Sequence, residues 1–265
     1  MKKNKLGLRI AALIAAICLI GFILSVANSL LGNPISSAFA KKAITSYVTK
    51  KYPSLELTIG EAKYNFKDSE YYSEVKSNTS IDTHFEVFCR NGKVRYDSYD
   101  SVLGKYNTLS RLEDEYSKIV IPILSKVKGL ENNNSIVQFE KWEANKDIKL
   151  DMPLDKAALV DMKVTIRVDL KDASLKNIAG IFEASHKKLI DNGCIFKSYS
   201  IFSDDDEELL IMIDNVTPSD IESGKLEEIL EDAQNKELKR GVSKEDEIRD
   251  TGISVYITKR KDIKK

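Results

Sequence analysis

The chain has 265 residues, with 41 basic and 41 acidic side chains, and 42% of its residues are hydrophobic. Four of the basic residues lie within the first nine positions, so the rest of the chain is mildly acidic. This balance lacks the basic patch that is typical of nucleic-acid-binding proteins, and we expect no nucleic-acid partner.

A basic leader, residues 1–9, precedes an apolar segment, residues 10–31, that carries no charged side chain. As a helix, this segment reaches about 33 Å, enough for a hydrocarbon core of about 30 Å. The apolar part of a secretory signal is usually only about 7–15 residues long. We therefore predict a transmembrane helix at residues 10–31.

The alternative is that the apolar segment is a signal that is removed after export. The sequence Ala38-Phe39-Ala40 fits a small-x-small cleavage site, but it follows Pro34 and lies among residues that are typical of a helix. For an uncleaved span, the positive-inside rule predicts a single-pass protein of the cell membrane with a cytoplasmic N-terminus. Everything after Asn33 would then be extracytoplasmic.

More residues follow the span than one small domain usually holds, so we expect two α+β domains. The first, residues 34–103, begins with a helix that Pro53 ends. Ser36 and Ser37 are its candidate caps. Its expected apolar stripe is formed by Phe39, Ala43, Tyr47 and Val48.

Short alternating runs follow this helix, and the clearest of them is "HFEVFCRNGKVRYDSY". Asn91-Gly92 between two alternating runs is typical of a type I′ hairpin, because both central residues need a positive φ. We predict a helix packed on a meander of three to five antiparallel strands, an arrangement similar to cystatin-like and PepSY-like modules.

Residues 104–134 are predicted to form a connecting helix and a loop, and the sequence leaves open which domain the helix packs on. Pro122 is expected to kink or split the helix. The predicted apolar stripe consists of Leu109, Leu112, Tyr116, Ile119, Ile123 and Val127.

The second domain, residues 135–265, shows the order strand, helix, strand, strand, helix, strand, which matches a ferredoxin-like split βαβ arrangement. An additional strand or linking segment with Val137 and Trp142 precedes it. The acidic run Asp204–Glu208 is interpreted as a solvated hairpin tip, because it lacks the ligand spacing of a calcium loop. Gly241 is expected to end the last helix.

No catalytic or metal-binding motif is recognisable, so we expect a non-enzymatic protein without a cofactor. Asp82 and His84 are weak candidates for a polar site at the edge of the first sheet. His186, on a helix between Ser185 and Lys187, is expected to be solvated.

Tyrosines crowd the first sheet, and their amphipathic rings suit a recognition surface. The candidates for binding are Tyr64, Tyr72 and Tyr96. Cys89 and Cys194 are expected to be buried free thiols, with a disulfide between them as the alternative that spacing cannot exclude.

The segments "LLGNPISSAFAKKAITSYVTKKYP", "YNFKDSEYYSEV" and "DTHFEVFCRNGKVRYDSY" resemble the YfjL-like family, membrane-anchored proteins of Gram-positive Firmicutes. The resemblance covers about residues 28–103, and the family also carries a second, C-terminal domain. It implies a topology and a host and transfers no catalytic residue. The segment from Asp82 to Phe85 is similar to one in the family, which favours Asp82 and His84 as candidates.

Two functions remain. The first is a membrane-anchored, extracytoplasmic module of the cell envelope that binds a protein, a peptide or a wall component. The alternative is an extracytoplasmic hydrolase that uses Asp82 and His84.

Overall fold

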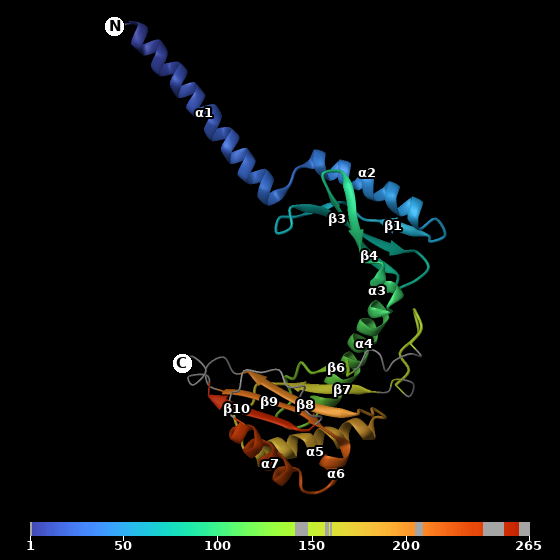
Figure 1. The fold of residues 1–265 in the computed structure, drawn as a ribbon. Coiled ribbons are helices and arrows are strands. Elements are labelled where there is room, and N and C mark those ends of the chain that lie inside the picture. Colours follow the sequence, from blue (N-terminus) through green and yellow to red (C-terminus); the bar gives the residue numbers. More distant parts are fainter. Residues whose placement is uncertain are drawn as a thin grey trace. The chain divides into compact units, whose positions relative to one another are not determined.

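The computed structural model describes six segments, residues 2–140, 148–156, 159, 161–204, 209–240 and 252–259. Three predicted features lie outside them: Trp142, the acidic run after Asp204, and the helix end at Gly241. The chain divides into two compact units, Met1–Asn107 and Thr108–Lys265 (Figure 1).

The first unit holds two long helices, a five-stranded sheet and one short helix. In chain order these elements are α1 (Lys2–Leu31), α2 (Pro34–Lys51), β1 (Leu57–Ile59), β2 (Lys63–Asn65), β3 (Glu70–Ser77), β4 (His84–Arg90), β5 (Lys93–Asp97) and α3 (Asp100–Leu103). The mixed helix and strand content that the sequence predicts is present, with α1 as the N-terminal apolar helix.

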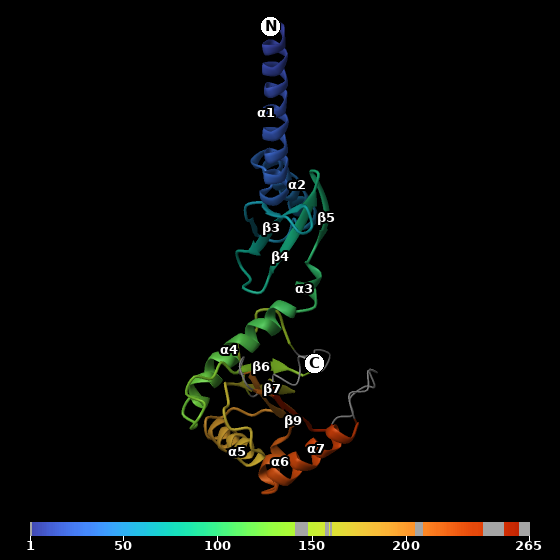
Figure 2. The ribbon, with the colours of Figure 1, turned by 90° about the vertical axis from the view of Figure 1, so that its left-hand side faces the viewer.

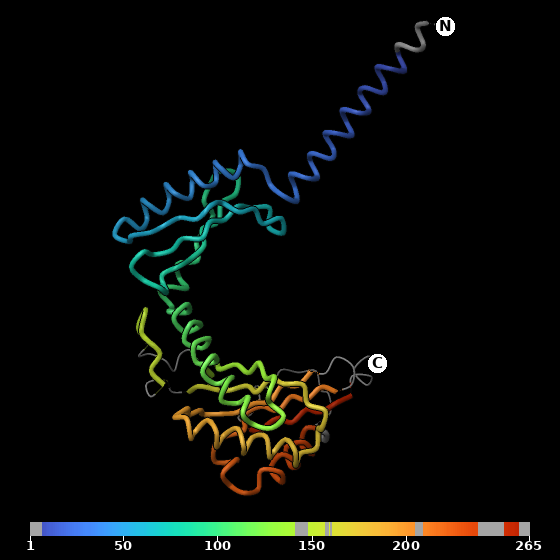
Figure 3. Tube along the Cα trace, turned by 180° about the vertical axis from the view of Figure 1, so that it is seen from behind, coloured from blue at the N-terminus to red at the C-terminus, as the bar shows by residue number. Residues whose placement is uncertain are grey.

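α1 and α2 are separated by a link of two residues, which Figure 3 shows as a sharp turn of the trace. Gly32 has a φ of +69°, a conformation that favours glycine. Asn33 caps α2, and its side-chain oxygen accepts a hydrogen bond from the Ser36 nitrogen at 2.7 Å. The predicted caps, Ser36 and Ser37, were therefore wrong, because Pro34 already occupies the first turn of α2.

α2 packs on one face of the first sheet (Figure 2). Its buried residues are Ala40, Ile44 and Val48. Of the predicted stripe, Val48 is buried, and Ala43 and Tyr47 are partly buried against the same core. Phe39 is instead exposed. Both phases carry apolar residues at a spacing of four, and the periodicity alone could not decide between them.

The first sheet is antiparallel throughout, with the order β1-β3-β4-β5 and with β2 also paired to β3. The hairpin at Asn91 and Gly92 is confirmed, with φ values of +52° and +70°. A shift of register between Phe88 and Cys89 follows, so that Phe88 lies opposite Tyr96. This irregularity determines the side chains that meet on the open face of the sheet.

The second unit contains four helices and a five-stranded sheet among its described residues. Its elements are α4 (Tyr106–Leu124), β6 (Ile136–Phe139), β7 (Met162–Arg167), α5 (Leu175–Asp191), β8 (Ser198–Asp204), β9 (Leu209–Val216), α6 (Pro218–Glu222), α7 (Leu226–Arg240) and β10 (Ser254–Lys259). α4 packs in the core of this unit, which answers the question that the sequence left open.

The stripe predicted for α4 was correct except at Ile119, which is partly exposed while Val120 and Leu124 are buried. Val120 lies four residues from both Tyr116 and Leu124, so it continues the buried face and Ile119 does not. α4 continues through Pro122 and ends at Leu124, so Pro122 does not split the helix.

The strand order of the second sheet is β10-β9-β8-β7-β6, and the prediction of a ferredoxin-like arrangement was wrong. A split βαβ unit has another strand between its two parallel strands. Here β7 and β8 pair directly and in parallel. β9 pairs antiparallel with β8 on the side away from β7, so the strands follow one another in sequence order. β6 is the predicted extra strand.

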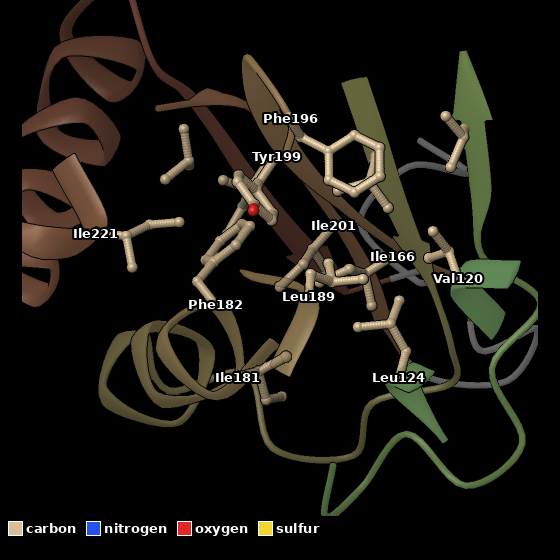
Figure 4. Close-up of a cluster of buried hydrophobic side chains, with 14 of the residues drawn as sticks. Val120, Leu124, Ile166, Ile181, Phe182, Leu189, Phe196, Tyr199, Ile201 and Ile221 are labelled. Carbon is tan, nitrogen blue, oxygen red and sulfur yellow. The ribbon is translucent and has the colours of Figure 1, made fainter. Parts of the chain in front are cut away.

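α5, α6 and α7 lie on one side of this sheet (Figure 1), and their apolar residues meet those of the strands. Figure 4 shows Phe182 and Leu189 of α5 and Leu124 of α4 in one buried cluster with Ile201 of β8, and Ile221 of α6 on the far side of Phe182. α4 runs beside the edge strand β6 and protects it. The Ser117 hydroxyl and the Glu113 carboxylate accept hydrogen bonds from the backbone nitrogens of Val137 and Phe139, both at 2.8 Å.

Cys89 and Cys194 are both free and buried, each in the core of its own unit. The prediction of two buried thiols is confirmed.

Candidate functional site

The face of the first sheet opposite α2 carries three aromatic rings on adjacent strands, Tyr72 of β3, Phe88 of β4 and Tyr96 of β5. Side chains alternate along a strand, so these three point away from the core residues Tyr71 and Val87. We call this set the aromatic ladder.

The rings of the aromatic ladder are stacked across the strands. The Phe88 centroid lies 4.5 Å from that of Tyr96, with an interplanar angle of 17°, and 5.9 Å from that of Tyr72, with an angle of 27°. Cross-strand aromatic pairs of this kind each contribute about 0.5–1.5 kcal/mol beyond area burial. Tyr96 nevertheless remains 51% exposed. The rings are thus preorganised and still accessible.

Acidic groups surround the hydroxyl of Tyr96. It donates a long hydrogen bond of 3.5 Å to Oε1 of Glu70, a carboxylate that is buried. Burial, followed by the charges of Glu70 and Asp68, raises the pKa of Tyr96 above its ordinary value. The phenol therefore stays protonated at neutral pH and keeps a hydrogen to donate.

Of the three predicted binding tyrosines, Tyr72 and Tyr96 lie in the aromatic ladder and Tyr64 does not. Tyr64 packs on Tyr71 on the opposite face, with 5.0 Å between ring centroids. Its hydroxyl donates to the carbonyl of Ser29 at 3.2 Å. Tyr71 accepts from the backbone nitrogen of Asn33 at 2.8 Å. Both rings therefore hold the link between α1 and α2 against the sheet.

Asp82 and His84 lie at the start of β4, but their side chains differ in environment. Asp82 is buried and His84 is exposed. Asn107 fixes the local backbone, because its side-chain nitrogen donates to the carbonyls of Asp82 and His84 at 2.8 and 2.7 Å. Neither residue lines the hollows described below.

A polar cluster at the C-terminal end of α2 was not predicted from the sequence. The carboxylate of Asp97 accepts hydrogen bonds from Tyr47, Tyr52 and Lys51, at 2.5, 2.9 and 2.8 Å. Burial alone would raise the pKa of Asp97, but the hydrogen bonds from Lys51 and the tyrosines outweigh it and lower the pKa. This cluster joins the C-terminal turn of α2 to the end of β5.

The open face of the second sheet holds a hollow of about 450 Å³ whose polar lining includes Lys163, Ser200 and Asp214. Asp214 accepts hydrogen bonds from both Ser200 and Lys163. Burial acts to raise the pKa of Asp214, but Ser200 and Lys163 lower it overall. Lys163 and Asp214 form an ion pair in this cluster, with 3.3 Å between Nζ and the carboxylate oxygen.

His186 is buried in the second unit, and the prediction that it is solvated was wrong. Its Nδ1 lies 2.8 Å from the Tyr199 hydroxyl and its Nε2 lies 3.1 Å from a carboxylate oxygen of Glu222. The sequence contained the signal, because position 186 is four residues after Phe182 and three before Leu189 on the buried face of α5.

Among the described residues, no group of three or more His, Cys, Asp or Glu side chains is placed to hold a metal ion. The acidic run after Asp204 lies outside these residues.

Sequence reasoning missed Phe88, the central ring of the aromatic ladder. A two-residue hairpin at Asn91 and Gly92 without irregularity would place Phe88 opposite Arg95. The register shift places it opposite Tyr96 instead. Alternation does put Phe88 on the same face as Glu86 and Arg90. The sheet face that carries Phe88 could therefore have been predicted, but its cross-strand neighbour on β5 could not.

Comparison with known proteins gives relatives for both units. The YfjL-like N-terminal domain matches residues 7–98, and the YfjL-like C-terminal domain matches residues 115–231. A Bacillus subtilis (strain 168) protein, described as the uncharacterized protein YfjL, is 27% identical over 206 residues, which cover 76% of this chain and 84% of the relative. No solved structure matches the chain. With a family domain matched in each of its two units, the chain belongs to the YfjL-like family.

Proposed function

We propose that α1 anchors the chain in the cell membrane as a single span and that the rest of the first unit and the second unit are extracytoplasmic. The aromatic ladder of the first unit binds a protein or peptide of the cell envelope. The protein acts by binding and not by catalysis. The observation that carries the proposal is the set of stacked, accessible rings Tyr72, Phe88 and Tyr96 on an open sheet face.

The length and surroundings of α1 support the membrane span. α1 is an N-terminal helix that is long and apolar enough to cross a membrane, and none of its apolar window is buried against the rest of the chain. Its basic leader supports a cytoplasmic N-terminus under the positive-inside rule.

The position of Ala40 supports an uncleaved anchor. Ala40 is buried in the middle of α2, where it packs against the first sheet. Cleavage after this residue would remove the first turns of α2, the Asn33 cap and the hydrogen bonds between Asn33 and Tyr71. A helix that contributes to the folded core is therefore a poor substrate for a signal peptidase.

The chemistry of the aromatic ladder supports a polypeptide partner. Aromatic rings are enriched at protein interfaces, where a large rigid surface is buried at a small cost in side-chain entropy. The charged side chains of Glu74 and Lys76 alternate with Val75 and so lie on the same face as Tyr72. Mixed charge around an apolar centre is the usual pattern of a polypeptide interface.

The layer order of the first unit, one helix over a meander, is similar to that of cystatin-like and PepSY-like modules, and we use the comparison as an analogy of architecture. The hydrolase alternative receives less support. A shared site would need the Asp82 and His84 side chains to converge in one cleft, and one is buried while the other is exposed.

Photocrosslinking in intact cells tests the proposal. The photoreactive residue p-benzoylphenylalanine is placed at Tyr72 or Tyr96 of the full chain, and at Tyr256 of β10 as the control. Tyr256 is also a half-exposed tyrosine on an open sheet face. We expect one adduct of the same mass from positions 72 and 96 and none from position 256. The absence of an adduct from the ladder, or the same products from all three positions, contradicts the proposal.

A further inference from the structure

Three large apolar side chains are exposed in the elements that follow α1. Ile35 and Phe39 are 71% and 64% exposed, and they lie four residues apart on one face of α2. Phe66, in the turn between β2 and β3, is 55% exposed. Exposed apolar side chains that gather in one place mark an interaction surface.

Contacts between these segments bring them to the same end of the unit. Phe39 lines a hollow of about 520 Å³ together with Ser69 and Gly92, so the tips of both hairpins reach the first turns of α2. Tyr64, two residues before Phe66, donates a hydrogen bond to the Ser29 carbonyl near the end of α1. The three apolar side chains therefore lie on segments that meet near the end of α1, where the proposed span would leave the bilayer.

The same segments are basic. Three lysines in these segments are exposed: Lys42 in α2, Lys67 in the turn between β2 and β3, and Lys93 at the start of β5. Within residues 35–42, 66–69 and 91–93 the only carboxylate is Asp68, and it accepts a hydrogen bond from the side chain of Asn65 at 2.6 Å. We call Ile35, Phe39, Phe66, Lys42, Lys67 and Lys93 the juxtamembrane rim.

We propose that the juxtamembrane rim lies on the lipid surface and seats the first unit against the bilayer. The inference rests on the proposed span, because it is the apolar segment ending at Leu31 that brings the rim to the membrane. Apolar side chains at such a surface enter the boundary between headgroups and acyl chains by about 5–10 Å. Lysine ammonium groups extend to the phosphates, where anionic lipids attract them.

The occupant is a lipid surface and not a second protein for two reasons. The rim continues directly from a segment whose length and composition suit a bilayer. Its pattern of phenylalanine and isoleucine among lysines is that of an interfacial segment. A seated unit would also hold the aromatic ladder at a fixed distance from the membrane, whereas a free tether would let it move.

Tryptophan fluorescence of the full chain in phospholipid vesicles tests the inference. The single tryptophan is first removed by Trp142→Phe, and Phe39→Trp or Phe66→Trp is then introduced. Both positions are exposed, so the substitutions leave the core unchanged. We expect a blue-shifted emission and strong quenching by lipids brominated near the top of their acyl chains. Lipids brominated near the chain ends should quench less.

Two control positions separate the inference from the proposal on which it rests. Phe22→Trp lies within α1 and should be quenched by deep bromines if α1 spans the bilayer. Ile81→Trp, exposed in the turn before β4, should not be quenched.

Each outcome decides one of the two ideas. If the Phe22→Trp variant is quenched and the Phe39→Trp and Phe66→Trp variants are not, the span stands and the seating is overturned. If the Phe22→Trp variant is not quenched, the span itself is wrong. A blue shift in the Phe39→Trp variant without quenching by lipid means that protein covers the rim, which also overturns the seating.

Discussion

The Lys51 ammonium lies 2.8 Å from a carboxylate oxygen of Asp97 and so joins the end of α2 to the end of β5. Tyr47 and Tyr52 donate their hydroxyl hydrogens to the same oxygen. One carboxylate with three donors is the main polar connection between the helix and that edge of the first sheet. The connection gives the first unit a defined dependence on pH.

We predict that the first unit loses stability in acid through Asp97. The pKa of Asp97 is lowered by its hydrogen bonds below its ordinary value, about 3.9 in an unfolded chain. The stabilisation is therefore complete above about pH 3.9 and is lost as pH falls through the lower folded-state pKa. Calorimetric unfolding of the full chain from about pH 3 to pH 7 checks this.

Asp97→Asn is the test variant, and Asp100→Asn, at an exposed position, is its control. We expect Asp97→Asn to lower the free energy of unfolding by about 2 kcal/mol at neutral pH and to flatten the acid slope. Asp100→Asn should change it by less than about 0.5 kcal/mol. If the free energy of unfolding of Asp97→Asn falls in acid as steeply as that of the unmodified chain, other carboxylates cause the loss of stability.

Gly32→Ala should disturb the link between α1 and α2. An added Cβ would lie 2.7–2.8 Å from the Tyr64 ring and the Tyr71 hydroxyl, at a φ of +69°. Gly92→Ala is a matched control with φ +70° and nothing within 4 Å of its Cβ. Both variants bear the cost of a positive φ, about 1 kcal/mol, so any additional loss in Gly32→Ala measures the steric clash.

Hydrogen exchange of the peptides that contain Asn33 and Tyr71 provides the measurement. Faster exchange in Gly32→Ala than in Gly92→Ala is the expected result. Equal exchange in the two variants would show that the link does not depend on the close approach of Gly32 to the tyrosine rings.

The elements of the first unit could be predicted because its signals are local. Alternation and the Asn91-Gly92 turn identify the strands. The phase of α2 and the partner of Phe88 could not be predicted, because each depends on packing or on a register shift that leaves no local mark. Two of the three rings in the aromatic ladder, Tyr72 and Tyr96, were nevertheless predicted as binding residues, and Phe88 was missed.

Tyr96→Ala should separate binding from stability. Tyr96 is half exposed on an edge strand, so its removal should cost less than about 1 kcal/mol of unfolding free energy. We expect the adduct formed from the photoreactive residue at Tyr72 to disappear all the same. Persistence of that adduct in the Tyr96→Ala background would exclude the ladder as the contact surface.

In the second unit, the order of helices and strands along the chain was predicted from the sequence, but the order of the strands within the sheet was predicted wrongly. The order strand, helix, strand, strand, helix, strand is compatible with more than one arrangement in space. The direct pairing of β7 with β8 is a long-range choice. This pairing depends on how α5, which connects the two strands, packs on the sheet. It also depends on β6 and α4, which cover the other edge of β7. No local sequence pattern indicates either feature.

His186 and Tyr199 should be energetically coupled. His186→Leu leaves the buried Tyr199 hydroxyl without its hydrogen-bond partner, which costs about 1–3 kcal/mol. Tyr199→Phe alone should cost about 1 kcal/mol. The double variant should be less destabilised than the sum by at least about 0.5 kcal/mol. Additive losses in urea unfolding would show that the hydrogen bond contributes nothing.

The central claim is that α1 stays in the membrane and that the rest of the first unit and the second unit lie outside the cell. Labelling with a membrane-impermeant maleimide on cells without their wall tests it, using Lys3→Cys in the leader and the exposed positions Lys67→Cys and Lys187→Cys. The native Cys89 and Cys194 are buried and should stay unlabelled. Cys18 lies within α1, so it should stay unlabelled if α1 is in the bilayer. The account predicts labelling at positions 67 and 187 in intact cells and at position 3 only after permeabilisation. Labelling at position 3 alone, or a mature protein in the medium that begins at Lys41, would contradict it.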